Sequence, residues 1–340
     1  MDGEGSSKRT ARLGLTIGLG GGAIGDEIAL CERAIESGYT DVWSAEVGGC
    51  DGFQPLAALS HNDGVRLGTA IIPVFTRPPA LIAMAAATMQ NLTKGRFVLG
   101  LGTSSDIIIK NWMGLTFTKP LTRLRETVEV LREVLAGKKV SFEGESFRLQ
   151  DFRLQLDPSA PTPIYLAALG PKACRMAGEI ADGVIFFLKT PDGVRQSLEW
   201  VAEGAKAAGR DPAELDCVIR VTVAMDEDPE VLRFVERRLI TTYAMVDVYN
   251  RSLAQQGFDV EAKEIVEAWR AGDRDRAAES VSDEMRGQLN IAGDAETCRL
   301  KLERFRVAGV KTPVVLPVSV AGDPHERNER VEQTMAALAP

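Results

Sequence analysis

Two loops of the sequence carry glycines and polar residues directly after short apolar segments that we predict to be strands. The first reads Gly100-Leu-Gly102-Thr103-Ser104-Ser105, and the second reads Ala168-Leu169-Gly170-Pro171-Lys172. Because the second loop opens a predicted helix, its unpaired N–H groups and the helix dipole suit a phosphate, and Lys172 adds positive charge. An ordinary turn with proline at the first helical position explains the same residues equally well.

An earlier glycine-rich loop contains G-x-G-x-x-G at Gly20, Gly22 and Gly25, and the acid Glu46 ends the next predicted strand. This spacing mimics the dinucleotide-binding fingerprint, in which glycines admit a pyrophosphate and an acid holds a ribose hydroxyl. A chain with 32 glycines produces a single match of this kind easily. We therefore prefer to interpret the segment as a flexible first loop at the mouth of a barrel.

The residues that most often serve zinc enzymes and serine hydrolases are scarce. The two histidines, His61 and His325, have no second histidine or cysteine at ligand spacing, so no metal site is expected. No G-x-S-x-G segment is present. These observations argue against both classes of enzyme.

Composition places the chain among ordinary globular proteins. It has 340 residues, 45% hydrophobic and 26% charged, with a net charge of −8, which argues against non-specific binding of nucleic acid. Five cysteines lie far apart, as is typical of free thiols in a reducing cytoplasm. The polar start resembles no signal peptide, and no apolar run is long enough for a membrane span. A cytoplasmic protein is expected.

Short β-branched apolar segments alternate with longer amphipathic ones along the chain. The predicted strands are 13–19, 41–46, 66–72, 96–102, 163–169, 182–187, 216–224 and 313–318. The predicted helices are 25–37, 54–60, 78–91, 120–136, 171–180, 191–208, 294–308 and 324–338. Eight strand–helix pairs predict an α/β protein of the (β/α)₈ TIM-barrel type, with an open doubly wound sheet as the competing arrangement.

Two segments interrupt this alternation. Residues 225–292 hold helical patterns and no predicted strand, so we expect a helical insertion between strands seven and eight, over the barrel mouth or at a dimer surface. Residues 138–162 form a shorter insertion before the fifth strand. We expect residues 1–10 to be a flexible N-terminus and residues 11–340 to form a single barrel domain.

Several motifs together resemble the luciferase-like monooxygenase family. They are GTAIIPVFTRPPALIAMAAATMQNLTKGRFVLGLGTSS from Gly68, W-x-G at 112–114, KPL at 119–121 and IYLAALGPKACRMAGEIADGVI at 164–185. Within the family they are most similar to the oxidoreductases that use the deazaflavin coenzyme F420, including relatives of methylenetetrahydromethanopterin reductase. The resemblance covers residues 11–224 and 288–318.

This resemblance implies a (β/α)₈ barrel, commonly a homodimer, that holds the coenzyme ring at its C-terminal mouth. It also implies a non-prolyl cis peptide bond at the end of strand three. The family motif aligns with Gly68-Thr69-Ala70-Ile71, which places this bond between Ala70 and Ile71. An ordinary strand with two core residues is the alternative.

The resemblance also implies roles for individual residues. Glu46 would lie beside the coenzyme ring as a catalytic candidate, unless it is a plain surface carboxylate, and Trp112 would wall the substrate pocket or simply pack. The remaining coenzyme-binding candidates are Ala70, Ile71, Thr103, Ser104, Ser105, Ala168, Leu169, Gly170, Pro171 and Lys172.

Two departures from the family limit the expected chemistry. Where the sugar-phosphate dehydrogenase branch has a histidine after the strand-two acid and a glutamate in the strand-four loop, this sequence has Val47 and Ser105. Oxidation of glucose phosphate is therefore not expected. Acid–base work would be left to Glu46, Asp106 or bound water, unless the reaction needs no acid or base.

The sequence thus predicts an oxidoreductase that transfers a hydride between coenzyme F420 and a small organic substrate. Two alternatives remain at this stage. One is an FMN-dependent two-component monooxygenase of the same fold, and the other is a barrel that binds a coenzyme without turnover.

Overall fold

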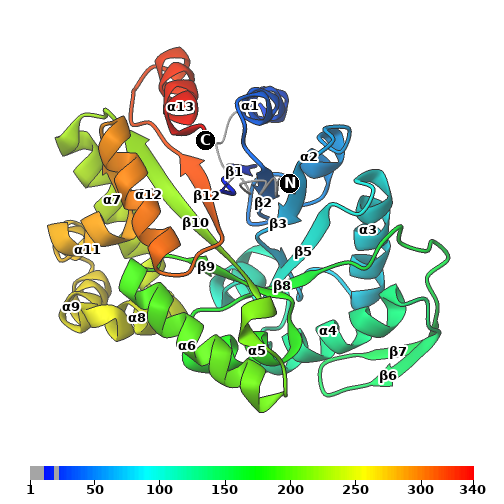
Figure 1. Cartoon of the computed structure of the whole chain (residues 1–340). Helices are drawn as coiled ribbons and strands as arrows, with labels where there is room; N and C mark the ends of the chain where they lie inside the picture. The colour runs from blue at the N-terminus through cyan, green and yellow to red at the C-terminus, as the bar shows by residue number, and fades with distance from the viewer. Residues whose placement is uncertain (1–10, 19–22) are drawn as a thin grey trace, which may run out of the picture.

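Residues 11–18 and 23–340 are described by a computed structural model, and within them eight parallel strand positions close into a barrel (Figure 1). Each strand pairs with the next around the ring, and the last pairs back with the first. In order, these strands are β1 (Gly14–Ile17), β2 (Asp41–Ser44), β3 (Arg66–Thr69) continued by β4 (Ile72–Pro73), β5 (Phe97–Gly102), β8 (Ile164–Ala167), β9 (Gly183–Phe187), β10 (Asp216–Met225) and β12 (Thr312–Pro317). The predicted (β/α)₈ barrel is confirmed, and the open sheet is excluded.

Helices follow the strands and surround the barrel, as Figure 1 shows. They are α1 (Ile24–Glu36), α2 (Gln54–Ala58), α3 (Pro79–Leu92), α4 (Pro120–Leu135), α5 (Pro171–Ile180), α6 (Pro191–Ala207), α12 (Ala295–Val307) and α13 (Pro324–Leu338). Four glycines, Gly38, Gly137, Gly209 and Gly309, have positive φ just beyond a helix, which glycine adopts without a Cβ clash.

Side chains on the strands alternate between two cores. Those that point outward, such as Leu15, Val42 and Leu67, pack under the helices, and those that point inward, such as Trp43 and Val98, fill the barrel. A Cβ at Gly68 would lie 2.5 Å from the Trp43 ring, so this glycine makes room for the indole.

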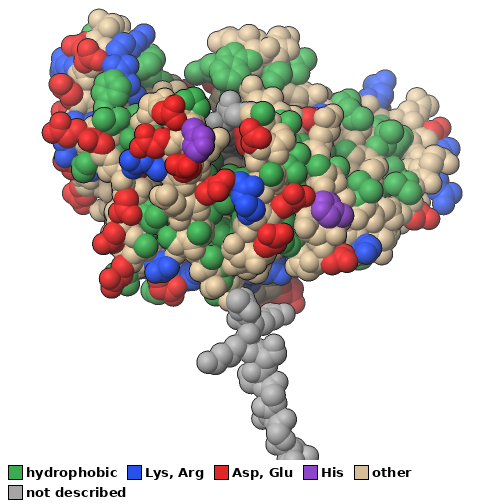
Figure 2. Space-filling model, turned by 90° about the horizontal axis from the view of Figure 1, so that it is seen from above, with side chains coloured by type: hydrophobic (Ala, Val, Ile, Leu, Met, Phe, Trp, Pro, Cys, Tyr) green, Lys and Arg blue, Asp and Glu red, His purple; other side chains and the backbone are tan. Residues whose placement is uncertain are grey.

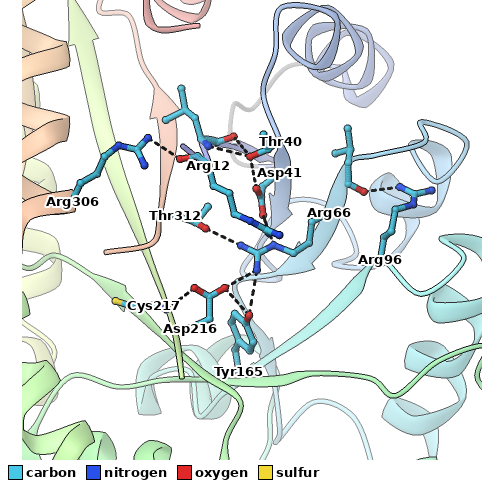
Figure 3. Close-up of polar contacts among 12 residues, drawn as sticks. Arg12, Thr40, Asp41, Arg66, Arg96, Tyr165, Asp216, Cys217, Arg306 and Thr312 are labelled. Atoms are coloured by element: carbon cyan, nitrogen blue, oxygen red, sulfur yellow. Dashed lines mark hydrogen bonds and ion pairs between the residues drawn. The ribbon is translucent and has the colours of Figure 1, made fainter. Parts of the chain in front are cut away.

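A charged cluster closes the N-terminal end of the barrel (Figure 3). The Arg66 guanidinium contacts Asp41, donates to Asp216 at 2.6 Å and to Thr312 at 2.8 Å, and lies over the Trp43 ring. Burial alone would lower the pKa of Arg66, but Asp41, Tyr165 and Asp216 together raise it. Because conserved chemistry in such barrels is placed at the opposite end, we interpret this cluster as structural.

The predicted helical insertion lies between β10 and β12. It consists of α7 (Pro229–Ala244), α8 (Asp247–Leu253), the π-helical turn η3 (Ala254–Phe258), α9 (Asp259–Arg270), α10 (Arg274–Glu279) and α11 (Asp283–Leu289). Its own core includes Ile240, Leu253 and Ile265 and is joined by Leu188 from the end of β9. The Gln256 side chain fixes it to the barrel by accepting from the Thr190 N–H at 2.7 Å.

Three sequence-based expectations need correction. The 225–292 segment does contain a strand, because β11 (Ile291–Gly293) pairs in parallel with β10; three residues are too few to show a strand pattern. The single strand predicted over 66–72 is split into β3 and β4 by Ala70 and Ile71. The 138–162 insertion contains an antiparallel hairpin, β6 (Val140–Glu143) with β7 (Arg148–Phe152), which we did not predict.

The expected flexible N-terminus, 1–10, and part of the G-x-G-x-x-G loop, 19–22, lie outside the described residues. Among the helices that the structure describes, none combines the length and the apolar character needed to cross a membrane. All five cysteines are free thiols, as predicted.

Candidate active site

A cavity of about 390 Å³ opens at the C-terminal ends of the barrel strands. Its walls are largely apolar and come from the loops after β2, β5 and β8, from the end of β9, from the middle of β10, and from α7 and α8. Position at this end of the barrel, size and apolar lining are those of a small-molecule site.

Most of the residues predicted for the site surround this one cavity. The predicted residues that line it are Glu46, Ala70, Ile71, Thr103, Ser104, Ser105, Trp112, Ala168, Leu169 and Gly170. Pro171 and Lys172 begin α5 immediately beyond Gly170 but are not part of the wall. Asp106 is also outside it and pairs with Lys110 at 3.5 Å.

Glu46 is held by a neighbouring arginine. Arg77 donates to Glu46 Oε2 at 2.6 Å and to Oε1 at 3.3 Å, and the Gly52 N–H and the Thr76 hydroxyl also donate to this carboxylate. The same guanidinium contacts Asp51. Charge-assisted hydrogen bonds of this kind fix the orientation of the carboxylate.

The expected cis peptide bond between Ala70 and Ile71 is present. These two residues form a bulge between β3 and β4 and line the cavity, and the Ile71 carbonyl accepts from the Glu46 N–H at 3.2 Å. A Cβ at Gly102 would lie 2.9 Å from the Ile71 side chain, and one at Gly100 only 1.7 Å from the Thr69 carbonyl oxygen. The glycines of the G-L-G motif therefore leave room for the bulge, a reason for their presence that the sequence did not show.

The loop after β5 places three hydroxyl residues at the rim of the cavity. Ser104 adopts a left-handed conformation with φ of 57°, and the Ser105 hydroxyl accepts from the Ile108 N–H at 3.3 Å. The turn ends in the π-helical segment η1 (Ile108–Trp112). Trp112 is 61% exposed and packs over Gly48, so it forms an open side wall rather than part of the core.

The loop after β8 leads into the uncapped N-terminus of α5. No side chain caps this helix, so the N–H groups of its first turn have no side-chain acceptor. Lys172 is exposed and makes no hydrogen bond or ion pair with any described residue. Behind the loop, Lys189 is only 2% exposed and donates to the Leu169 carbonyl at 2.7 Å, and burial lowers its pKa to about 8.

Sequence reasoning missed Arg220, Phe187, Tyr243 and Tyr249, all of which line the cavity. Arg220 had a detectable signal, because it is the one basic residue in the apolar segment 216–224 and shares its face with Val218. The tyrosines lie in the segment that we expected over the barrel mouth or at a dimer surface, but no motif distinguished them from its other residues. Both histidines are exposed and remote from the cavity lining, and Figure 2 shows histidine side chains on the outer surface.

A (β/α)₈ barrel with a preformed apolar cavity at its C-terminal mouth is the architecture of a small-molecule enzyme. The chain belongs to the luciferase-like monooxygenase family, whose model matches residues 8–312.

Within this family, the chain is similar to proteins that are named for coenzyme F420 or for methylenetetrahydromethanopterin. A Mycobacterium tuberculosis protein assigned to the coenzyme F420-dependent oxidoreductases is 32% identical over 331 residues, covering 89% of this chain and 94% of the relative. The 5,10-methylenetetrahydromethanopterin reductase of Archaeoglobus fulgidus is 30% identical, covering 76% and 78%. The solved coenzyme F420-dependent tetrahydromethanopterin reductase of Methanopyrus kandleri superposes with a TM-score of 0.77 at 26% identity, covering 95% and 98%.

Proposed function

We propose that this protein is a coenzyme F420-dependent oxidoreductase that transfers a hydride between the deazaflavin and a small organic substrate. The proposal is supported by the relatives described above and carried by one observation. The cavity combines an apolar bulge, at Ala70 and Ile71, with the uncapped start of α5 at Gly170. An apolar shelf suits a planar ring, and a helix N-terminus suits the coenzyme phosphate.

The residues present fit such a coenzyme. Ala70 and Ile71 would support the ring, Thr103, Ser104 and Ser105 would offer hydroxyl groups at one edge, and Gly170 has open space where a side chain would stand. The coenzyme, when bound, supplies a carbon centre that donates or accepts a hydride.

The chain itself positions and shields the reactants. Because Arg77 holds the Glu46 carboxylate in one orientation, Glu46 would serve as a fixed polar group beside the ring. Trp112 and the helices α7 and α8 line the cavity and would restrict the access of water to a bound coenzyme. Pro171 and Lys172 complete the phosphate-binding start of α5 in this proposal.

We further propose a homodimer with a reducing, cytoplasmic environment. Helix α3 exposes an apolar stripe of Leu81, Met84 and Leu92, which a second copy of the chain would cover. The five free thiols suit a reducing compartment. Neither nucleic acid nor a membrane is among the proposed partners, and residues 11–340 are proposed to act as one domain.

Titration with purified coenzymes tests the proposal. The protein is mixed with oxidised and reduced F420 and, in parallel, with FMN, and binding is followed by coenzyme fluorescence and absorbance. We expect F420 to bind at least about tenfold more tightly than FMN. Preference for FMN together with oxygen consumption by the reduced form would favour the monooxygenase alternative. Binding of neither would refute the assignment.

A further inference from the structure

Arg220 belongs to the inner wall of the barrel. On β10, the side chains of Cys217, Ile219 and Val221 point outward into the core beneath the helices. Strand alternation therefore turns Val218 and Arg220 inward, and Val218 indeed packs in the barrel interior. Arg220 lies two residues closer to the mouth and lines the cavity.

The Arg220 guanidinium has almost no polar partner. Its Nη1 donates to the Ala70 carbonyl at a long 3.4 Å, its Nε is buried without an acceptor, and no described carboxylate forms an ion pair with it. Glu46 is the other charged residue in the lining, and Arg77 already holds it. A half-buried guanidinium that faces the cavity without a counter-charge is available to pair with an anion there.

Aromatic rings surround this cation on its apolar side. The guanidinium carbon lies 4.4 Å from the centre of the Phe187 ring. Tyr243 lies 5.0 Å from both Phe187 and Tyr249, measured between ring centres. Burial raises the pKa of Tyr249 to about 12, so this phenol is neutral near pH 7 and supplies no negative charge to Arg220.

We propose that Arg220, Phe187, Tyr243 and Tyr249 form a substrate subsite for a carboxylate attached to an apolar or aromatic body. A planar guanidinium pairs with a carboxylate through two parallel hydrogen bonds, and its stacking on Phe187 fixes its plane beforehand. A phosphate would bring two negative charges to one arginine in an otherwise apolar wall, so the single charge of a carboxylate fits better. The subsite rests on the proposed function, because it names the substrate class of the same cavity.

Matched pairs of probes test the subsite by calorimetry on the full chain, with and without F420. The carboxylates benzoate, cinnamate and 2-naphthoate are each compared with the corresponding neutral amide. We expect at least one carboxylate to bind about tenfold more tightly than its amide. Arg220→Met should abolish this preference, and Arg220→Lys should retain part of it because the charge remains.

Arg238→Met is the matched control. Arg238 stacks on Phe234 and pairs with Asp275 outside the cavity, so its removal should leave the preference unchanged. Circular dichroism confirms that each variant is folded, and Arg220→Lys preserves the test should Arg220→Met not fold.

Three results would overturn the subsite. In the first, the wild-type protein binds no carboxylate more tightly than its amide. In the second, Arg220→Met keeps the carboxylate preference. In the third, Arg220→Met loses affinity for F420 while its binding of the probes is unchanged. The last result would assign Arg220 to the coenzyme instead. If the protein prefers carboxylates through Arg220 but does not bind F420, the subsite is supported and the proposed function is refuted. The failure of one proposal can therefore be distinguished from the failure of the other.

Discussion

At the scale of single residues, the two charged side chains in the cavity wall differ in how their charge is balanced. Glu46 is paired with Arg77 and keeps one orientation, whereas Arg220 meets only a carbonyl and aromatic rings. A carboxylate that already has a counter-charge helps to position the groups around it. A guanidinium without a counter-charge can bind an incoming anionic group. The predicted catalytic candidate Glu46 is therefore assigned to positioning.

Arg77→Met should lower the free energy of unfolding at pH 7 by about 1–3 kcal/mol, because it leaves Glu46 and Asp51 without their shared cation. Urea unfolding measures the change. Arg125→Met, which breaks an exposed pair with Glu179, is the control and should cost less than about 1 kcal/mol. Equal losses in the two variants would contradict the prediction.

The effect of Arg77 should also depend on pH. Burial alone would raise the pKa of Asp51, but the N–H groups of Phe53 and Gln54 and the Arg77 guanidinium lower it. A carboxyl with a lowered folded pKa stabilises the fold above its unfolded pKa of about 3.9, and this contribution disappears as the pH falls through the folded value. The difference between wild type and Arg77→Met should therefore be smaller at pH 3 than at pH 7.

Lys189 should make stability depend on pH in the same direction, but in the alkaline range. Burial lowers its folded pKa to about 8, so between pH 8 and the unfolded value near 10.4 the unfolded chain holds a proton that the folded protein has released. The stability of the wild type relative to Lys189→Met should rise across this window by roughly 1–3 kcal/mol in total. Urea unfolding at pH 7 and at intervals up to pH 10 measures it, and a constant difference would contradict the assigned burial.

At the scale of elements, the sequence predicted the parts that depend on local patterns. Buried parallel strands appear as short apolar runs, and glycine or proline marks the helix ends, so the strand and helix order followed from the sequence. The cis bond between Ala70 and Ile71 came from the family motif alone. The β6–β7 hairpin and β11 were missed because their short strands are half exposed or only three residues long.

The sequence predicted those site residues that directly follow a strand, but not those that other parts of the chain contribute. Residues that follow a strand, such as Thr103 and Gly170, are placed at the barrel mouth by the fold itself. Arg77 also follows a strand, β4, but its contact with Glu46 is tertiary. No spacing in the sequence encodes that contact or the position of Tyr243 in the cavity wall.

The start of α5 supports a prediction about the coenzyme. Lys172→Ala should weaken binding of F420 about tenfold, because a lysine hydrogen bond to a charged group contributes roughly 1.5–3 kcal/mol and the side chain has no other partner among the described residues. Binding of the phosphate-free deazaflavin chromophore should remain unchanged. Fluorescence titration of both ligands distinguishes the outcomes, and equal losses for the two would show that this loop is only a turn.

At the scale of the whole molecule, stability and function are divided between the two ends of the barrel. The Arg66 cluster closes the N-terminal end with ion pairs, as Figure 3 shows, whereas the C-terminal end carries the cavity and its covering helices. Acidic and basic side chains are interspersed on the face shown in Figure 2. An interface with a second copy is therefore expected on an apolar helix face rather than on a charged one.

Helix α3 offers such a face. Leu81, Met84 and Leu92 are 43%, 50% and 47% exposed, and their spacing places them along one side of the helix with Thr88. In a two-fold symmetric dimer, the same stripe of both copies would meet near the axis. We expect the wild-type protein to be a dimer at micromolar concentration in light scattering after size exclusion.

Met84→Glu should dissociate this dimer. The substitution brings two carboxylates, one from each copy, into an apolar contact, and like charges placed together in an interface cost several kcal/mol, enough to raise the dimer dissociation constant by about a hundredfold or more. Val260→Glu is the control, because Val260 is at least as exposed as Met84 but lies on α9 in the helical segment between β10 and β12. A monomeric wild-type protein, or dissociation by Val260→Glu and not by Met84→Glu, would show that α3 is not the interface. The fold of both variants is checked by their melting temperatures, which should stay close to each other because each change is made at an exposed position.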